Sequence, residues 1–80
     1  MMSHFCPDAV NVTPLEWRTL LVEFADGSVK ACDLSELGGV FSRLHDRELF
    51  LKAHVEAGAV IWDETLDIAP EYLYEHGTPV

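Results

Sequence analysis

Residues 20–33 carry the clearest fold signal of the chain and read Leu20-Leu-Val-Glu-Phe24, then Ala25-Asp-Gly-Ser28, then Val29-Lys-Ala-Cys-Asp33. Asp26-Gly27 between two runs of strand-forming residues is the strongest short-range signal for a β-hairpin. A type I′ turn needs a positive φ at both central residues, which glycine adopts freely and aspartate tolerates. The stretch therefore predicts an antiparallel hairpin with Asp26-Gly27 as its two-residue turn.

This turn sets the pairing of the two strands. It places Phe24 opposite Val29, Glu23 opposite Lys30 and Val22 opposite Ala31. One face is then apolar, while the other face carries a pair of opposite charges. Each cross-strand pair contributes only about 0.2–1 kcal/mol, and a lone hairpin is marginally stable in water. We therefore expect more strands and a helix to cover it.

Further strand signals lie on both sides of the hairpin. Val10-Asn11-Val12 alternates as a short strand that ends at Pro14, because proline cannot donate to a ladder. Residues 54–56 and 59–62 predict a second hairpin that turns at Ala57-Gly58, and residues 66–68 alternate briefly. The expected fold class is α+β. We expect a small antiparallel sheet of about five strands, built from a three-stranded meander and the second hairpin, with two or three short helices.

The helices are predicted from signals at their ends. Asp33 can cap a short helical turn that Gly38-Gly39 ends, and Asp46 can cap a second helix that runs to about Lys52. Pro70 suits the first turn of a last helix, where its missing amide has no partner. The apolar side chains expected to anchor these segments are Val40, Phe41, Leu44, Leu49, Phe50, Leu73 and Tyr74.

Eighty residues have room for one small hydrophobic core. We expect a single domain over residues 9–80, preceded by a flexible segment over residues 1–8. The start of the chain lacks the basic and apolar runs of a secretory signal, and no window approaches a membrane span. With only Cys6 and Cys32, the chain is no disulfide scaffold. A cytoplasmic location follows, with Cys32 as a small buried apolar residue.

The charge balance is strongly acidic. Fourteen acidic and five basic side chains give a formal charge of −9. Because nucleic-acid binding depends on the neutralisation of phosphates, direct binding to DNA or RNA is not expected, nor is binding to an anionic membrane surface. The same field favours a basic partner. The alternative is that the acidity only keeps the protein soluble.

Asp63, Glu64 and Asp67 are the candidate functional carboxylates. They lie close in sequence and could act in acid–base chemistry or bind a hard cation. The alternative is a solvated turn, with Asp67 bonding backbone amides before the helix at Pro70. No cofactor or metal is expected, because the histidines and cysteines lack the close pairing of a zinc site. Those residues are His4, Cys6, Cys32, His45, His54 and His76.

Four aromatic side chains could form a contact surface. Trp62 and Tyr74 suit the core, whereas Trp17, which stands in a connection, suits an exposed contact. Aromatic residues are enriched at the energetic centres of protein interfaces. Trp17 with Tyr72 is therefore the predicted aromatic part of an interaction surface.

Several short motifs, in order and at matching spacing, resemble a family of small bacterial domains known as domain of unknown function 2442. These motifs are Phe24-Ala-Asp-Gly27, Asp33-Leu34, Phe41-Ser-Arg-Leu44, Asp46 with Phe50, Gly58-Ala-Val-Ile-Trp62 and Leu66-Asp-Ile-Ala-Pro70-Glu-Tyr-Leu-Tyr74. The resemblance implies an antiparallel sheet with short helices. Members are often encoded beside a small protein that looks like a ribosome-dependent nuclease toxin, and some carry a DNA-binding helix-turn-helix. This chain ends at Val80 without such a helix-turn-helix, so we do not expect a transcription regulator.

The function expected first is a small cytosolic protein–protein interaction module and not an enzyme. It would pair with itself as a homo-oligomer or with a small basic protein, and the resemblance implies an antitoxin-like role. The alternative is a small ligand-binding domain or enzyme that uses His54 with Asp63, Glu64 and Asp67. A third possibility, a nucleic-acid-associated regulator, requires a basic patch from Arg18, Lys30, Arg43, Arg47 and Lys52.

Overall fold

The computed structural model describes residues 6–15 and 18–80. Its strands and helices are β1 (Ala9–Pro14), β2 (Thr19–Phe24), β3 (Val29–Asp33), the 3-10 helix η1 (Gly39–His45), α1 (Arg47–Phe50), β4 (His54–Glu56), β5 (Ala59–Asp63), β6 (Leu66–Ile68), α2 (Pro70–His76) and β7 (Thr78–Pro79). The α+β class is confirmed.

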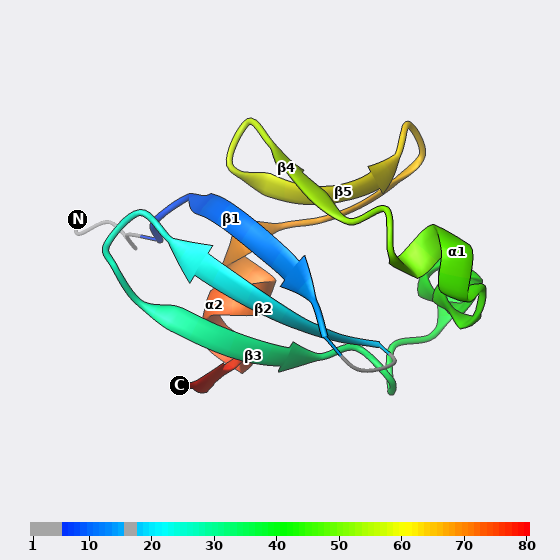
Figure 1. Cartoon of the computed structure of the whole chain (residues 1–80), viewed down its shortest axis with the longest axis horizontal. Coiled ribbons are helices and arrows are strands. Elements are labelled where there is room, and N and C mark those ends of the chain that lie inside the picture. Colours follow the sequence, from blue (N-terminus) through cyan, green and yellow to red (C-terminus); the bar gives the residue numbers. More distant parts are fainter. Residues whose placement is uncertain (1–5, 16–17) are drawn as a thin grey trace.

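The strands form two antiparallel sheets, so the prediction of one sheet of about five strands is wrong. The first sheet has the order β1-β2-β3-β7 and the second has the order β4-β5-β6. Figure 1 shows the β4–β5 hairpin as a separate layer that lies next to β1, the edge strand of the first sheet. A bulge between Ala9 and Asn11 disrupts β1, and the Val12 amide donates to the Asn11 side chain. Among the described residues, β1 and β4 belong to different ladders.

The predicted three-stranded meander β1-β2-β3 is confirmed, but the register of its hairpin is wrong by one residue. Val22 lies opposite Lys30, and Glu23 lies opposite Val29. The loop has three residues, because the amide of Phe24 donates to the carbonyl of Ser28. Gly27 has a φ of +90°, whereas Asp26 is not among the residues with positive φ. This is a three-residue loop with glycine in the bulge position.

The corrected register moves Lys30 to the inner face of the sheet. Val22 is fully buried, and a residue directly opposite another on a neighbouring strand shares its face. Lys30 therefore points toward the side that α2 covers (Figure 1). The expected surface pair of Glu23 with Lys30 does not form. Lys30 instead places its ammonium 3.9 Å from the ring centroid of Tyr74.

The second hairpin turns at Ala57-Gly58 as predicted. Both residues have positive φ, +53° and +83°, which is the requirement of a type I′ turn. The turn also joins the two sheets, because the amide of Ala9 donates to the carbonyl of Gly58 at 2.9 Å. A Cβ on Gly58 would lie 2.6 Å from Cγ of Asp8, so glycine is required there for close approach as well as for its φ.

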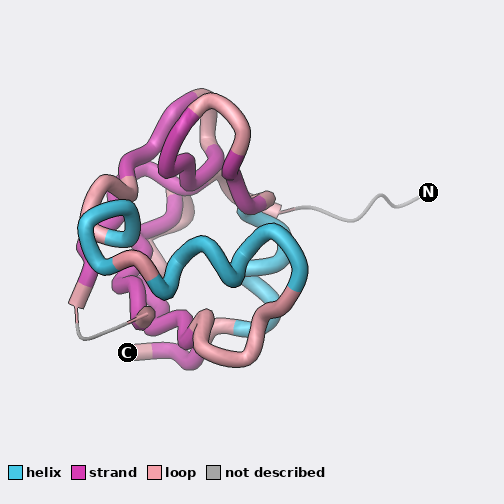
Figure 2. Tube along the Cα trace, turned by 90° about the vertical axis from the view of Figure 1, so that its right-hand side faces the viewer, coloured by secondary structure: helices cyan, strands magenta, loops and turns pink. Residues whose placement is uncertain are grey.

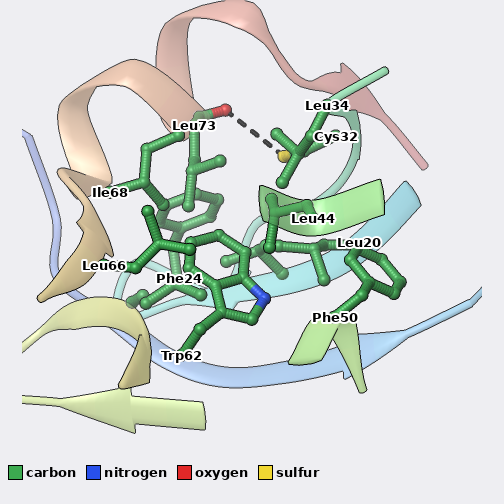
Figure 3. Packing of buried hydrophobic residues seen from close by; sticks show 13 residues of the cluster. Leu20, Phe24, Cys32, Leu34, Leu44, Phe50, Trp62, Leu66, Ile68 and Leu73 are labelled. Atoms are coloured by element: carbon green, nitrogen blue, oxygen red, sulfur yellow. Dashed lines mark hydrogen bonds between the residues drawn. The ribbon is translucent and has the colours of Figure 1, made fainter. Parts of the chain in front are cut away.

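One hydrophobic core lies between the sheets and the helices (Figure 3). Trp62 is 2% exposed, as expected of a core residue. Its ring packs edge-on against Phe41, with the ring centroids 6.4 Å apart. Val40 is 61% exposed, so its predicted role as an apolar anchor is wrong. The buried side chains of this core are Ala9, Leu20, Val22, Phe24, Cys32, Leu34, Leu44, Phe50, Val60, Trp62, Leu66, Ile68 and Leu73.

The helical segments are short. Asp46 caps α1 as predicted, accepting from the amide of Glu48 at 3.0 Å. Asp33 starts no helix; its carboxylate accepts from the amide of Ser35 and closes a turn. The chain between them forms η1, which begins at Gly39 where the glycines predicted an end.

Seen from the side on which α1 lies, η1 and α1 lie in front of the strands (Figure 2). The last helix, α2, starts at Pro70 as predicted. Beyond it the chain returns to β3 as β7, a strand that the sequence did not predict. No helix in the described ranges is long and apolar enough to cross a membrane.

Candidate functional site

The outward face of the β4-β5-β6 sheet brings together side chains from three strands. Val60, Trp62 and Leu66 point into the core, so the residues that alternate with them point away from it. The register places Ile61 of β5 between His54 of β4 and Asp67 of β6. An apolar side chain thus lies in the middle of a row whose two ends are ionisable.

The three residues of this row line a surface depression of about 530 Å³, which we call the acidic depression. It is lined by His54, Glu56, Ile61, Asp63, Glu64 and Asp67. The three carboxylates singled out from the sequence, Asp63, Glu64 and Asp67, therefore border one depression, together with His54 and Glu56.

Asp63 builds the turn between β5 and β6. Its Oδ1 accepts from the amide and the hydroxyl of Thr65 at 2.9 and 3.0 Å. Its Oδ2 accepts from the guanidinium of Arg43 at 2.6 Å, and the same guanidinium donates to the Thr65 hydroxyl. The Thr65 amide, and then Arg43, hold the pKa of Asp63 below its usual value. Asp63 thus has the backbone-bonding role that the solvated-turn alternative assigned to Asp67.

Glu64 and Asp67 are exposed and chemically available. Within the ranges that the structure describes, neither side chain makes a hydrogen bond or an ion pair. Two carboxylates at the border of an apolar surface can therefore accept hydrogen bonds from a ligand that carries a positive charge.

His54 is held between two acceptors. Its Nδ1 lies 2.9 Å from the carbonyl oxygen of Lys52, and its Nε2 lies 2.7 Å from Oε2 of Glu56. The Lys52 carbonyl, and then the Glu56 carboxylate, raise the pKa of His54 above its usual value. Glu56 was not singled out from the sequence. The available signal was the strand alternation, which puts residues two apart on one face.

The fold and this arrangement can be compared with known proteins. The family model described as "Protein of unknown function (DUF2442)" matches residues 9–79. The chain belongs to the DUF2442 family. No curated protein and no solved structure matches it. Membership confirms the family resemblance and, because the family's description states no activity, leaves the function to be argued from this DUF2442 chain itself.

The predicted aromatic contact has only one described member. Trp17 lies outside the described residues. Tyr72, on α2, stacks on His76 with ring centroids 4.2 Å apart and rings inclined by 19°. It is half-buried against the core and does not line the acidic depression. The structure therefore does not join Tyr72 to the three carboxylates.

The basic residues of this DUF2442 chain have different surroundings. Arg43 and Lys52 line a second depression, of about 390 Å³, together with Asp46, Glu48 and Leu49. Arg18 lies 3.1 Å from Nε2 of His45, while Lys30 lies against α2. The surface around Arg43 and Lys52 is thus of mixed charge, which does not suit phosphate binding.

Metal ligation has no geometric support in residues 6–15 and 18–80. No three of the described histidine, cysteine, aspartate and glutamate side chains lie close enough to hold one ion. His4, one of the zinc candidates considered from the sequence, lies outside the described residues.

Proposed function

We propose that this chain is a small cytosolic protein–protein interaction module that binds a basic segment of a partner at the acidic depression. The observation that carries the proposal is the half-buried Ile61, which lines the depression between His54 and Asp67, with Glu64 at the border. A lysine or arginine of the partner can lay its apolar stem on Ile61 and place its charge at Glu64 and Asp67.

The wider charge distribution supports a basic partner. Residues 53–80 hold six acidic side chains and no lysine or arginine. Although Arg43 of η1 pairs with Asp63, this acidic excess accelerates the encounter with a positively charged protein and disfavours a partner of like charge. A second copy would bring the same negative field, so a different, basic protein fits better than a homo-oligomer.

The outward face of β4-β5-β6 suits this contact better than the two edges of the first sheet. The edge strand β1 is interrupted by a bulge, and the Asn11 side chain occupies the Val12 amide. The other edge strand, β7, has two residues and ends at Pro79. Bulges, prolines and very short strands are devices that prevent edge-to-edge pairing. We therefore place the partner on the outward face of β4-β5-β6.

The lowered pKa of Asp63 and the exposure of Glu64 and Asp67 favour binding over catalysis. The pKa of Asp63 is lowered by the Thr65 amide and by Arg43, whereas a general acid at neutral pH needs a raised pKa. Glu64 and Asp67 are exposed to solvent.

The narrower version of the proposal is an antitoxin-like subunit whose partner is a small basic toxin-like protein.

The proposal is tested by purifying the tagged chain from its native cells and identifying co-eluting proteins by mass spectrometry. We expect a basic protein with the wild type and its loss with the double variant Glu64→Gln/Asp67→Asn. The matched control is Glu23→Gln/Glu36→Gln, which removes two exposed charges elsewhere and should keep the partner. Equal retention by both variants, or the absence of a basic partner, would overturn the proposal.

A second measurement needs no knowledge of the partner. A short synthetic peptide that alternates arginine with valine is titrated into the labelled chain and followed by NMR. The amide shifts should concentrate on His54, Ile61 and Asp67. Shifts spread evenly over the acidic surface would mean nonspecific attraction and would contradict a built site.

A further inference from the structure

His54 contacts two groups that can only accept hydrogen bonds. A backbone carbonyl has no proton to donate, and an ionised carboxylate has none either. The contacts of Nδ1 with the Lys52 carbonyl and of Nε2 with Glu56 therefore each require an N–H on the imidazole. A neutral imidazole carries one N–H, so both contacts can exist together only when the ring is protonated.

From this geometry we infer that His54 is a proton-controlled latch at the border of the acidic depression. The protonated ring ties Glu56 to the α1–β4 connection through the Lys52 carbonyl. Loss of the proton breaks one of the two contacts. If the contact with Glu56 is the one lost, that carboxylate is released to the depression.

The charged groups that face His54 determine how its deprotonation changes the binding of cations at the acidic depression. Asp63 of β5, Glu64 of the following turn and Asp67 of β6 line the depression with it, and Arg43 of η1 compensates Asp63. Glu56 lies on the same strand, and the side chain of Lys52 belongs to the connection before it. Deprotonation of His54 removes one positive charge from a surface dominated by carboxylates, so the depression becomes a stronger site for cations.

The inference rests on the proposed function in one respect, namely that the depression binds a basic segment. On that basis, affinity for such a segment increases as the pH rises through the titration of His54. This deepens the proposal from a constitutive contact to one that the proton concentration regulates.

The latch itself is tested without any ligand, by NMR titration of the full chain. We expect His54 to titrate above the midpoint of a histidine in the unfolded chain, and the Glu56 carboxyl carbon to show a transition at the same midpoint. Glu56→Gln should lower the midpoint of His54 clearly more than Glu64→Gln, which removes the same charge from a lining residue without a contact to the ring. Equal midpoints in the wild type and in Glu56→Gln would overturn the latch.

The regulation is tested with the arginine–valine peptide, within the pH range in which the carboxylates stay ionised. Binding by the wild type should tighten severalfold from below to above the His54 midpoint, and binding by His54→Gln should not change. Peptide binding that is independent of pH in the wild type refutes the regulation and leaves the proposed function standing. No binding at any pH refutes the proposed function, while the NMR titration still decides the latch.

Discussion

Lys30 of β3 places its ammonium over the ring of Tyr74 on α2, with Nζ 3.9 Å from the ring centroid and 2.5 Å from the Tyr74 carbonyl oxygen. One side chain thus makes a cation–π contact and donates to a carbonyl in the last turn of a helix. Both interactions favour a cation at that position. Lys30 therefore joins the first sheet to α2 electrostatically.

Lys30→Met should consequently destabilise the fold. Methionine keeps most of the apolar stem but loses both contacts, for an expected cost of about 1 kcal/mol in the free energy of unfolding. The measurement is urea unfolding followed by tryptophan fluorescence. Lys52→Met, a change at an exposed basic residue, is the control and should be neutral. An equal effect of the two substitutions would show that Lys30 contributes to the free energy of unfolding only through the net charge of the protein.

Gly77 allows α2 and β3 to approach closely. A Cβ at this position would lie 2.7 Å from the Leu73 carbonyl oxygen and 2.9 Å from Sγ of Cys32. Since the helix backbone cannot easily move, Gly77→Ala should cost about 1–3 kcal/mol of stability. Gly38→Ala has nothing within 4 Å of its new Cβ and should stay within about 0.5 kcal/mol of the wild type. Similar unfolding midpoints for the two variants would contradict this close approach.

Cys32 should be chemically inert in the folded protein. Burial raises the pKa of its thiol to about 11, and its Sγ–H points to the Leu73 carbonyl at 3.6 Å (Figure 3). Because the thiolate is the reactive form, iodoacetamide at pH 8 should modify Cys32 far more slowly in the folded chain than in urea. The experiment uses Cys6→Ser, which leaves one thiol, with mass spectrometry as the readout. Rapid modification without denaturant would mean that β3 is accessible.

The stability of the chain should depend on pH through His54. Its pKa in the folded state is raised by the Lys52 carbonyl and by Glu56. Its contribution is therefore fully present below the unfolded pKa of about 6.5 and is lost as the pH rises through the folded pKa. The difference in unfolding free energy between the wild type and His54→Gln should shrink from pH 6 to pH 9. A difference that grows with pH would contradict the assigned contacts.

Part of the acidic depression was visible in the sequence. Asp63, Glu64 and Asp67 stand out because they are close along the chain, and they do border one depression. Their different surroundings were not visible. Arg43 is 20 residues from Asp63 in sequence, and only the packing of η1 against the β5–β6 turn brings the two together. Glu56 joins the site because β4 pairs with β5, which is also a tertiary fact.

Features that arise from interactions between neighbouring residues could be predicted from the sequence. The turn at Ala57-Gly58, the cap at Asp46 and the start of α2 at Pro70 follow from backbone preferences and short side-chain hydrogen bonds, which act within a few residues. The burial of Trp62 agrees with its place in the apolar run of residues 59–62. These local signals agree with the final structure, so they could be interpreted without it.

Three features depend on contacts between distant parts of the chain: the register of the first hairpin, the division into two sheets and the addition of β7. Asp26-Gly27 is compatible with loops of two or three residues. The three-residue loop turns Lys30 and Cys32 of β3, instead of Val29 and Ala31, to the buried face of β2 and places Lys30 against Tyr74. The energies that select among such alternatives come from contacts between distant parts of the chain. A shift of one residue reverses which face of a strand is buried, and the alternation within β3 by itself favours Val29 and Ala31, not Lys30 and Cys32, on the buried face.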